Sequence, residues 1–284
     1  MPRPLTSSAV VLTTGSRSAE LTSALRSLEQ SGVTDRLVIW NSSLPAPQSP
    51  GDYQMISAGS NLGIPGGRNF GGNNCTGDII VFLDDDAEVL THNLRARTNE
   101  IFSNHPTCAV VAFRIVDENG ETVRRHNPRL GNYAVDKPGT VATFLGGACA
   151  IRRTAFEQCG GYDRSFFYSM EEQDLAWRLF AAGYFVHYAP EIIVQHPRTS
   201  PSRHDGALKR TWENRSSAAG KSLPFPLMVL YLVTHGVRGA IHGLPPGWAF
   251  RTALQRIREL NEGRQPMRWK TVLKLASVGR PPIF

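Results

Sequence analysis

The stretch Ile79-Ile80-Val81-Phe82-Leu83-Asp84-Asp85-Asp86 is an apolar run that ends in three consecutive carboxylates. Five apolar residues in a row are typical of a strand that is buried on both faces, as in a parallel sheet. The acids then lie at the carboxyl end of the strand, the edge where open α/β sheets bind ligands. Adjacent carboxylates repel one another unless a cation or hydrogen-bond donors neutralise them, and hard oxygen ligands suit Mg²⁺ or Mn²⁺. The triplet is therefore interpreted as a metal site, with a solvated acidic turn as the simpler alternative.

The composition is that of a folded chain with unevenly placed charge. Its 284 residues are 41% hydrophobic and 19% charged, enough for one large α/β domain or two small ones. No apolar run reaches the length of about 18 residues that a membrane span needs, and no signal sequence is evident, so we expect a cytoplasmic location. The four cysteines lack CxxC spacing and are expected to be reduced. Residues 1–196 hold 16 Lys and Arg against 20 Asp and Glu, whereas residues 197–284 hold 15 against 4.

The order of the expected elements is that of an α/β sheet. Hydrophobic periodicity predicts, in order, strands at 9–13, 36–40 and 53–57 with a helix at 20–30, a Gly-rich helix that starts near Pro65, a helix at 91–102, and strands at 108–116, 184–188 and 191–195. The polar segment 117–138 is long for a connection, which predicts a hairpin or a mobile functional loop. Gly146 and Gly147 interrupt an apolar run, 141–152, where glycine lets another chain or a ligand approach the backbone.

A second acidic group opens a predicted helix. Glu171, Glu172 and Asp174 occupy its first turn, behind the aromatic residues Phe167 and Tyr168. Acids at this position either complement the helix dipole or provide a general base in a site from which water is excluded.

Two further segments carry candidate binding residues. In the Gly-rich segment 61–72, Arg68 and Asn69 favour contacts to a diphosphate or a base over a plain flexible loop. His196 follows the last predicted strand and is either a structural residue or a third metal ligand.

Taken together, these segments resemble the family 2 glycosyltransferases of the GT-A fold, from about Ala9 to Arg215. The order of the matching segments carries the resemblance: Thr14 and Arg17, Asn41 to Ser43, Asn61 to Asn69, Leu83 to Asp86, Gly160 to Leu179, and His196. It implies a Rossmann-like mixed, mainly parallel sheet with flanking helices. The catalytic domain would span 1–215, with a nucleotide-sugar half at 1–116 and an acceptor half at 117–215, followed by a basic helical tail at 216–284.

The resemblance also implies residue roles. Asp86 would be the direct metal ligand, together with Asp84 and His196, for Mg²⁺ or Mn²⁺. Residues implied to bind the donor are Thr14, Arg17, Asn41, Asn61, Gly63, Arg68, Asn69, Asp84 and Asp85. Glu172 would be the catalytic base, accompanied by Glu171 and Asp174. Gly146, Gly147, Phe167 and Tyr168 would lie on the acceptor side.

The implied reaction is a single displacement with inversion. It moves a sugar from a nucleotide-diphosphate donor, with UDP or dTDP as the first expectation, to a hydroxyl of a glycan, a glycolipid or a small molecule; no nucleic-acid partner is expected. Trp40 and Gly15-Ser16 depart from the family pattern and leave the donor base open. The alternatives are a sugar nucleotidyltransferase, which needs a Gly-rich signature with Lys or Arg after the first strand, and a non-catalytic binding module, which would not need a base.

The tail contains two amphipathic patterns. Phe250, Ala253, Leu254, Ile257 and Leu260 share one predicted helix face, and Trp269, Val272, Leu273 and Ala276 share another, each beside Lys and Arg. Basic amphipathic helices suit an anionic membrane surface, such as the inner face of the cell membrane. Packing on the catalytic domain or in a homodimer is the alternative.

Overall fold

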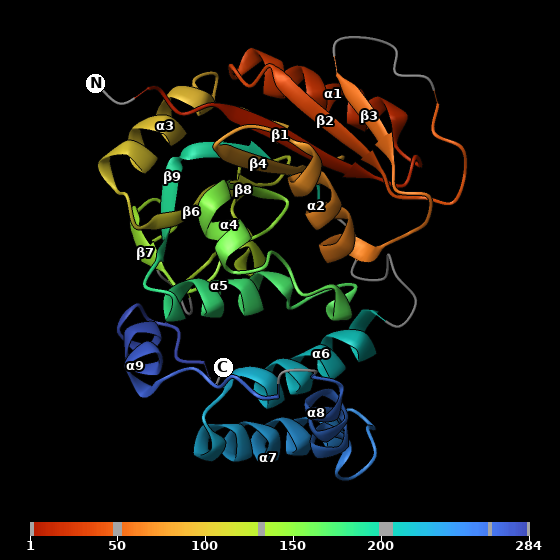
Figure 1. The fold of residues 1–284 in the computed structure, drawn as a ribbon, viewed down its shortest axis with the longest axis vertical. Coiled ribbons are helices and arrows are strands. Elements are labelled where there is room, and N and C mark those ends of the chain that lie inside the picture. Colours follow the sequence, from red (N-terminus) through yellow and green to blue (C-terminus); the bar gives the residue numbers. More distant parts are fainter. Residues whose placement is uncertain (1–2, 48–52, 130–133, 199–206, 261–262, 283–284) are drawn as a thin grey trace.

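The structure, a computed structural model, describes residues 3–47, 53–129, 134–198, 207–260 and 263–282. Within these residues the strands form one sheet, and helices cover both of its faces (Figure 1). The strands are β1 (Ser7–Thr13), β2 (Asp35–Trp40), β3 (Gln54–Ser57), β4 (Ile79–Asp84), β5 (Glu88–Val89), β6 (Cys108–Val116), β7 (Gly139–Val141), β8 (Ala148–Arg152) and β9 (Phe185–Gln195). The helices are α1 (Ser18–Gln30), α2 (Gly63–Asn74), α3 (Leu94–Asn104), α4 (Arg153–Gln158), α5 (Glu171–Ala181), α6 (Ala207–Ser222), α7 (Phe225–Ile241), α8 (Trp248–Glu259) and α9 (Trp269–Ser277).

The sheet is mixed and mainly parallel, as predicted. Its strand order is β3-β2-β1-β4-β8-β6-β9-β5, with β7 paired to β9. Strands β1 to β4 run parallel, whereas β8 pairs antiparallel with both β4 and β6. The carboxyl ends of β1, β2 and β4 therefore meet at one edge, where the acidic triplet lies.

The central strands are buried on both faces because each face has its own apolar core. Val10 and Phe82 point to the core beneath α2, α4 and α5, while Val11 and Val81 point to the core beneath α1 and α3. This two-sided burial confirms the interpretation of the apolar run before Asp84.

The predicted division of the last strand is wrong, and the structure specifies two other segments further; a mobile functional loop at 117–138 stays a prediction. The strands predicted at 184–188 and 191–195 are one strand, β9, because Pro190 lies where the pairing with β6 shifts register, so the strand bends there without ending. The run 141–152 is divided between β7 and β8. The described part of 117–138 forms a short 3₁₀ helix, Arg124–His126, and no hairpin.

The C-terminal helices pack on the rest of the chain. Figure 1 shows α6, α7 and α8 below α5, with α9 beside the end of α5. Buried side chains of this group, such as Leu232, Ala253 and Leu275, belong to the same core as α5. Residue 215, where the sequence predicted the boundary between the catalytic domain and the tail, lies inside helix α6. The domain boundary stays a prediction.

The predicted apolar face of α9 is divided between the interior and the surface. Thr271, Val272 and Leu275 are buried, whereas Trp269 and Leu273 are 51% and 67% exposed. Because these residues are exposed, binding of the tail to a membrane surface or to a second copy of the chain stays a prediction. Among the described residues, no helix has the length and apolar character that crossing a membrane requires.

Candidate active site

The acidic triplet is neutralised by side chains that the neighbouring loop brings to it. Thr13 Oγ1, at the end of β1, donates a 2.6 Å hydrogen bond to Asp85 Oδ2. Arg17, just before α1, lies 2.9 Å from Asp85 Oδ1 and 2.6 Å from Asp86 Oδ2. Burial still raises the pKa of Asp85 above its ordinary value. The solvated-turn alternative does not hold, because Asp85 and Asp86 are each only 8% exposed.

Asp84, Asp86 and His196 form a group that fits a divalent metal ion. One ligand atom of each lies within 4.8 Å of the others. His196 Nε2 is 3.3 Å from Asp86 Oδ1 and 3.7 Å from Asp84 Oδ2, and its Nδ1 faces the Pro197 carbonyl at 3.0 Å. An Nδ1–H bond to a carbonyl is the arrangement that leaves Nε2 free to coordinate a metal.

Without a metal, the imidazole offsets part of the negative charge of this group. Burial acts to lower the pKa of His196, but hydrogen bonds to Asp84 and Asp86 outweigh it and raise the pKa to about 10. Burial acts to raise the pKa of Asp84, and the hydrogen bond from His196 and the charge of Arg68 lower it. A divalent cation would take over this neutralisation, with His196 as a neutral ligand.

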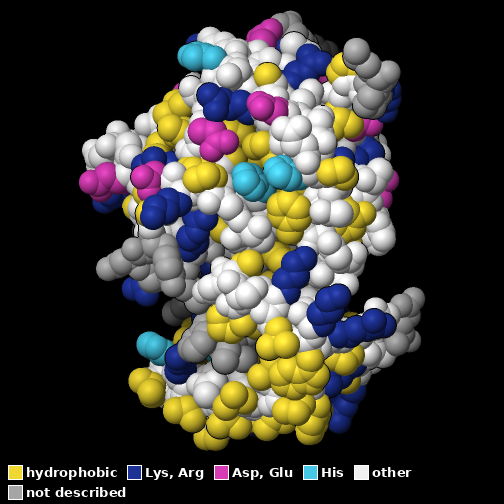
Figure 2. All heavy atoms as spheres, turned by 90° about the vertical axis from the view of Figure 1, so that its left-hand side faces the viewer, with side chains coloured by type: hydrophobic (Ala, Val, Ile, Leu, Met, Phe, Trp, Pro, Cys, Tyr) yellow, Lys and Arg dark blue, Asp and Glu magenta, His cyan; other side chains and the backbone are white. Residues whose placement is uncertain are grey.

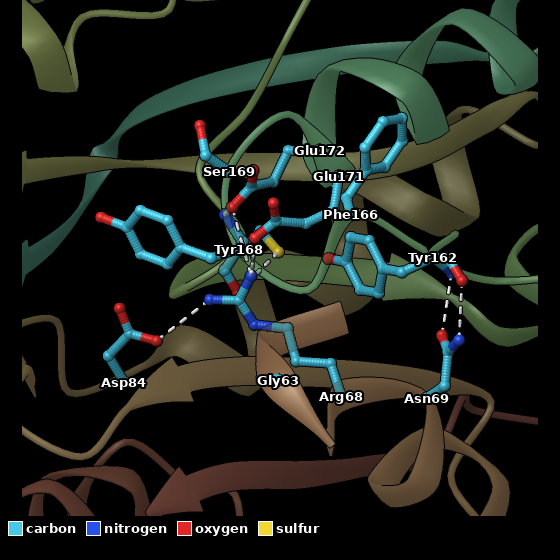
Figure 3. A network of polar contacts seen from close by, with 12 residues as sticks. Gly63, Arg68, Asn69, Asp84, Tyr162, Phe166, Tyr168, Ser169, Glu171 and Glu172 are labelled. Carbon is cyan, nitrogen blue, oxygen red and sulfur yellow. Dashed lines mark hydrogen bonds and ion pairs between the residues drawn. The ribbon is translucent and has the colours of Figure 1, made fainter. Parts of the chain in front are cut away.

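Arg68 occupies the centre of the site, between the acidic triplet and the start of α5 (Figure 3). Its Nη2 lies 3.1 Å from Asp84 Oδ1, and its Nη1 lies 3.2 Å from Glu172 Oε1 and 3.6 Å from Glu171 Oε1. The guanidinium carbon is 5.8 Å from the centre of the Tyr162 ring. One buried cation therefore links the candidate metal group to the candidate base.

The Gly-rich sequence of α2 explains how Arg68 reaches this position. A Cβ atom at Gly67 would lie 2.3 Å from Leu12, and one at Gly71 would lie 2.3 Å from Val10. The helix can thus approach β1 more closely than a helix with larger side chains. Gly67 and Gly71 therefore serve to pack α2 closely on the sheet.

Glu171 and Glu172 have different surroundings. Glu172 is 19% exposed at its side chain, and its Oε1 also accepts a 3.1 Å hydrogen bond from the Gly146 amide. Glu171 is 2% exposed, and its Oε2 has no hydrogen-bond donor among the described residues. Burial, followed by the charge of Glu172, raises the pKa of Glu171 well above its ordinary value. Glu172 is therefore the carboxylate that remains accessible, and Glu171 favours its protonated form.

Gly146 and Gly147 bring the backbone against the charged cluster. A Cβ atom at Gly146 would lie 2.1 Å from Arg68 Nη1, and one at Gly147 would lie 2.0 Å from Asp84 Oδ2. The predicted close approach at these glycines is present, but the groups that approach are side chains of the chain itself. Tyr168 lies beside the same cluster (Figure 3), whereas Phe167 packs near Gly63. The acceptor-side roles of both residues stay predictions.

The other donor residues of the prediction are placed as follows. Asn41, at the end of β2, donates to Asn61 Oδ1 and to the Gly63 carbonyl and accepts from the Leu62 amide, so it fixes the loop before α2. Asn69 bonds both the amide and the carbonyl of Tyr162. Thr14 is exposed after β1. Their donor-binding roles stay predictions.

Asp174 is not brought into the cluster. Its carboxylate is fully buried and pairs with Arg178 at 2.6 Å and Lys221 at 2.8 Å, so it joins α5 to α6.

The two departures from the family pattern compensate each other. A Cβ atom at Gly15 would lie 2.0 Å from the Trp40 ring, so the indole occupies the space that a larger side chain at 15 would need. The Trp40 N–H donates to the Leu44 carbonyl at 2.8 Å.

Sequence reasoning missed three residues of the site. Thr13 precedes Thr14, and Tyr162 lies within the matching segment Gly160 to Leu179, but neither position indicated a contact. Asn214 opens an Asn-Arg-Ser triplet that resembles a glycosylation site. It is 7% exposed and bonds the loop before α5.

Comparison with known proteins finds the family that the motifs resemble in part of the chain. Residues 31–160 match the family model described as glycosyl transferase family 2. A pre-mycofactocin glycosyltransferase of Mycobacterium tuberculosis is 27% identical over 176 residues, which are 59% of this chain and 37% of the relative. An N-acetylglucosaminyl-diphospho-decaprenol L-rhamnosyltransferase of the same species is 40% identical over 75 residues, 26% of this chain and 24% of the relative. The chain thus spans less than half the length of these relatives.

Solved structures show the same fold. A crystal structure of GalNAc-T7 with UDP, GalNAc and Mn²⁺ matches 98% of this chain and 57% of that chain, with a TM-score of 0.69 and 17% identity. The mannosyltransferase PcManGT from Pyrobaculum calidifontis, in complex with GDP-Man and Mn²⁺, matches 97% of this chain and 79% of its own, with a TM-score of 0.55 and 16% identity. The fold is therefore that of the GT-A glycosyltransferases.

Proposed function

With residues 31–160 identified as a glycosyl transferase family 2 region on a GT-A fold, we propose that this protein is an inverting, metal-assisted glycosyltransferase. The observation that carries the proposal is the position of Arg68, which contacts Asp84 with one nitrogen and Glu172 with the other. A donor diphosphate near Asp84 and an acceptor hydroxyl near Glu172 would then share one site.

The metal would be held by Asp84, Asp86 and His196, the group whose ligand atoms converge. Carboxylate oxygens and one imidazole suit Mn²⁺ or Mg²⁺. When bound, the ion supplies positive charge for the departing diphosphate. Arg17 already pairs with Asp85 and Asp86 and therefore positions these carboxylates. This engagement disfavours the nucleotidyltransferase alternative, which needs a basic residue after β1 for phosphate.

Glu172 is the proposed general base. It removes the proton of the acceptor hydroxyl while that oxygen attacks the anomeric carbon. The bond from the anomeric carbon to the phosphate oxygen breaks, and the nucleoside diphosphate leaves with the bonding electrons. Arg68 Nη1 places a positive charge 3.2 Å from this carboxylate. Attack from the face opposite the leaving group inverts the anomeric configuration.

The donor and acceptor follow from the chemistry of similar proteins. Solved structures with this fold are complexes with UDP, UDP-GlcNAc or GDP-Man. We keep UDP or dTDP as the proposed donor nucleotides and a hydroxyl of a glycan, glycolipid or small molecule as the acceptor. One similar protein is named for a diphospho-decaprenol acceptor, which supports testing lipid-linked sugars first.

A thermal-shift screen tests the proposal. The full chain is heated with UDP-, dTDP- and GDP-sugars, with and without MnCl₂. We expect one nucleotide class to raise the Tm only when the metal is present. Asp86→Ala should lose this shift, whereas Glu88→Ala, which changes an exposed acid outside the cluster, should keep it. The transfer product of the responding donor is then examined by proton NMR, and an anomeric configuration equal to that of the donor would contradict inversion.

A further inference from the structure

The exposed apolar side chains of this protein are concentrated at one end. Of the eleven large hydrophobic side chains that are exposed among the described residues, eight lie on α7, α8 and α9. Figure 2 shows hydrophobic side chains gathered over the helical end of the molecule, with Lys and Arg beside them. We call this the α7–α9 surface; it consists of Phe225, Leu230, Val233, Val237, Ile241, Leu254, Trp269 and Leu273.

Helix α7 presents an apolar stripe opposite its packed face. Leu230, Val233, Val237 and Ile241 recur at intervals of three and four residues and are 48% to 78% exposed. The same helix buries Met228, Leu232, His235 and Gly239 against the rest of the chain. The stripe therefore lies along one side of a helix whose other side is already used.

Basic side chains accompany this surface, and acidic ones are nearly absent. Arg251 and Arg258 lie one turn from Leu254 on α8, while Lys270 and Lys274 follow Trp269 and Leu273 on α9; all four are exposed. Residues 214–284 contain eleven Lys and Arg and only two acids, Glu259 and Glu262. The surface thus combines apolar area with positive charge.

We infer that the α7–α9 surface binds an anionic lipid surface peripherally. Apolar side chains that enter the boundary between headgroups and acyl chains, together with basic residues at its edge, are the features of interfacial helices. A second copy of the chain fits less well, because a two-fold interface would place this positive charge against itself.

Vesicle sedimentation with the full chain tests the inference. We expect binding to vesicles of equal parts phosphatidylglycerol and phosphatidylcholine, weaker binding to pure phosphatidylcholine, and loss of binding as salt rises. Arg251→Ala and Arg258→Ala should each lower the affinity about fivefold. Val237→Asp combined with Ile241→Asp should lower it about tenfold or more, while Leu44→Asp, at an equally exposed leucine between β2 and β3, should leave it unchanged.

Any of three results would overturn the inference. The first is that the wild-type chain fails to sediment with anionic vesicles at low salt, and the second is that the Leu44→Asp control loses as much binding as the Val237→Asp, Ile241→Asp double variant. The third is that sedimentation velocity shows a dimer that this double variant dissociates. The last result would assign the surface to a second copy.

A separate observation concerns the loop before α5. Phe167, Ser169 and Met170 have φ angles of 56°, 69° and 76°, which non-glycine residues rarely adopt. The loop leads directly into Glu171 and Glu172. An unusual backbone at this position persists only if surrounding contacts hold it.

Two parts of the chain hold this loop from opposite sides. On one side the Ile64 amide donates a 2.8 Å hydrogen bond to the Phe167 carbonyl, and a Cβ atom at Gly63 would lie 2.5 Å from that oxygen. On the other side Asn214 Nδ2, from α6, lies 2.9, 2.7 and 2.9 Å from the carbonyl oxygens of Phe166, Tyr168 and Ser169.

The geometry points to Asn214 as a positioning residue for Glu172, so that α6 supports the active site from outside it. The assignment of Asn214 rests on the proposed function only where it concerns the reaction rate. Asn214→Ala removes the donor, and amide hydrogen exchange in residues 167–172 should become about tenfold faster, as expected for loss of a buried hydrogen bond. Glu213→Ala, the exposed neighbour on α6, is the matched control.

Once a donor and an acceptor are known, Asn214→Ala should lower kcat with little change in the KM of the donor. Leu275→Ala, in the core between α5 and the C-terminal helices, serves as a variant with reduced Tm but an intact loop, and its kcat per folded molecule should stay normal. Unchanged exchange in Asn214→Ala overturns the assignment whether or not the protein proves to be a glycosyltransferase. If Leu275→Ala loses as much kcat as Asn214→Ala, lower stability alone would explain the loss of kcat in Asn214→Ala.

Discussion

Replacing Arg68 by methionine isolates the interaction at the centre of the site. The Arg68 guanidinium is 5% exposed and lies 3.1 to 3.6 Å from three carboxylates, those of Asp84, Glu171 and Glu172. The pairs with Asp84 and Glu172 are each worth about 5 kcal/mol at an effective dielectric constant of about 20, before the desolvation of both partners is subtracted. Glu171 favours its protonated form and is left out of this sum. Asp84 is 38% exposed, so solvent screens its share. Removing one member of a buried ion pair costs about 3 to 5 kcal/mol, and we expect Arg68→Met to lower the free energy of unfolding by that amount at neutral pH.

The loss should shrink in acid. Without Arg68 the carboxylates repel one another in the folded state, which raises their pKa, so the folded state gains protons as the pH falls and the repulsion disappears. Urea denaturation of the wild type and Arg68→Met at neutral pH and near pH 5 measures both effects. Arg68→Lys keeps the charge but cannot contact Asp84 and Glu172 with two nitrogens, so its loss should be intermediate. A loss below about 1 kcal/mol for Arg68→Met, equal at both pH values, would refute this account of the cluster.

Two other substitutions test the packing of the site and of the C-terminal helices. A Cβ atom at Gly147 would lie 2.0 Å from Asp84 Oδ2, so Gly147→Ala should weaken metal-dependent donor binding, measured by thermal shift, while Gly236→Ala, whose Cβ would meet its nearest neighbour at 3.8 Å, should not. Burial lowers the pKa of His235 to about 4, so the unfolded state binds more protons between that value and the ordinary value of 6.5. Stability should therefore fall as the pH drops below 6.5, by up to about 1.4 kcal/mol per unit from this residue. In urea titrations, His235→Phe should flatten the pH dependence of the free energy of unfolding. An unchanged pH dependence would exclude His235 as its source.

The fold was accessible from the sequence because its signals are local. The five apolar residues before Asp84 predicted a two-sided strand, and the acids after it predicted the functional edge of the sheet. The break predicted within β9 failed because Pro190 normally ends a strand, whereas here the partner strand shifts register and pairing continues. The sequence left open what the apolar face of α9 contacts, because amphipathic spacing does not say which of its residues another surface covers.

The candidate site was only partly accessible. Sequence patterns located Asp84, Asp86, Glu172 and His196, and the structure brings them around Arg68. Sequence patterns could not show that the side-chain amides of Asn41 and Asn69 hydrogen-bond backbone groups, or that Asp174 pairs with Lys221. These contacts join residues 20 to 100 positions apart, and no periodicity or short motif records them.

The difference between Glu171 and Glu172 gives the most direct test of the proposed chemistry. Burial keeps Glu171 in its protonated form, so Glu171→Gln replaces one neutral group by another of the same shape. Glu172 is the accessible carboxylate, and Glu172→Gln cannot accept the acceptor's proton. Single-turnover rates with the responding donor and acceptor should fall about 10²- to 10⁴-fold for Glu172→Gln, with donor affinity retained. They should stay near the wild-type rate for Glu171→Gln. A larger loss at Glu171 would move the base to the buried residue, and normal rates in both variants would remove α5 from the chemistry.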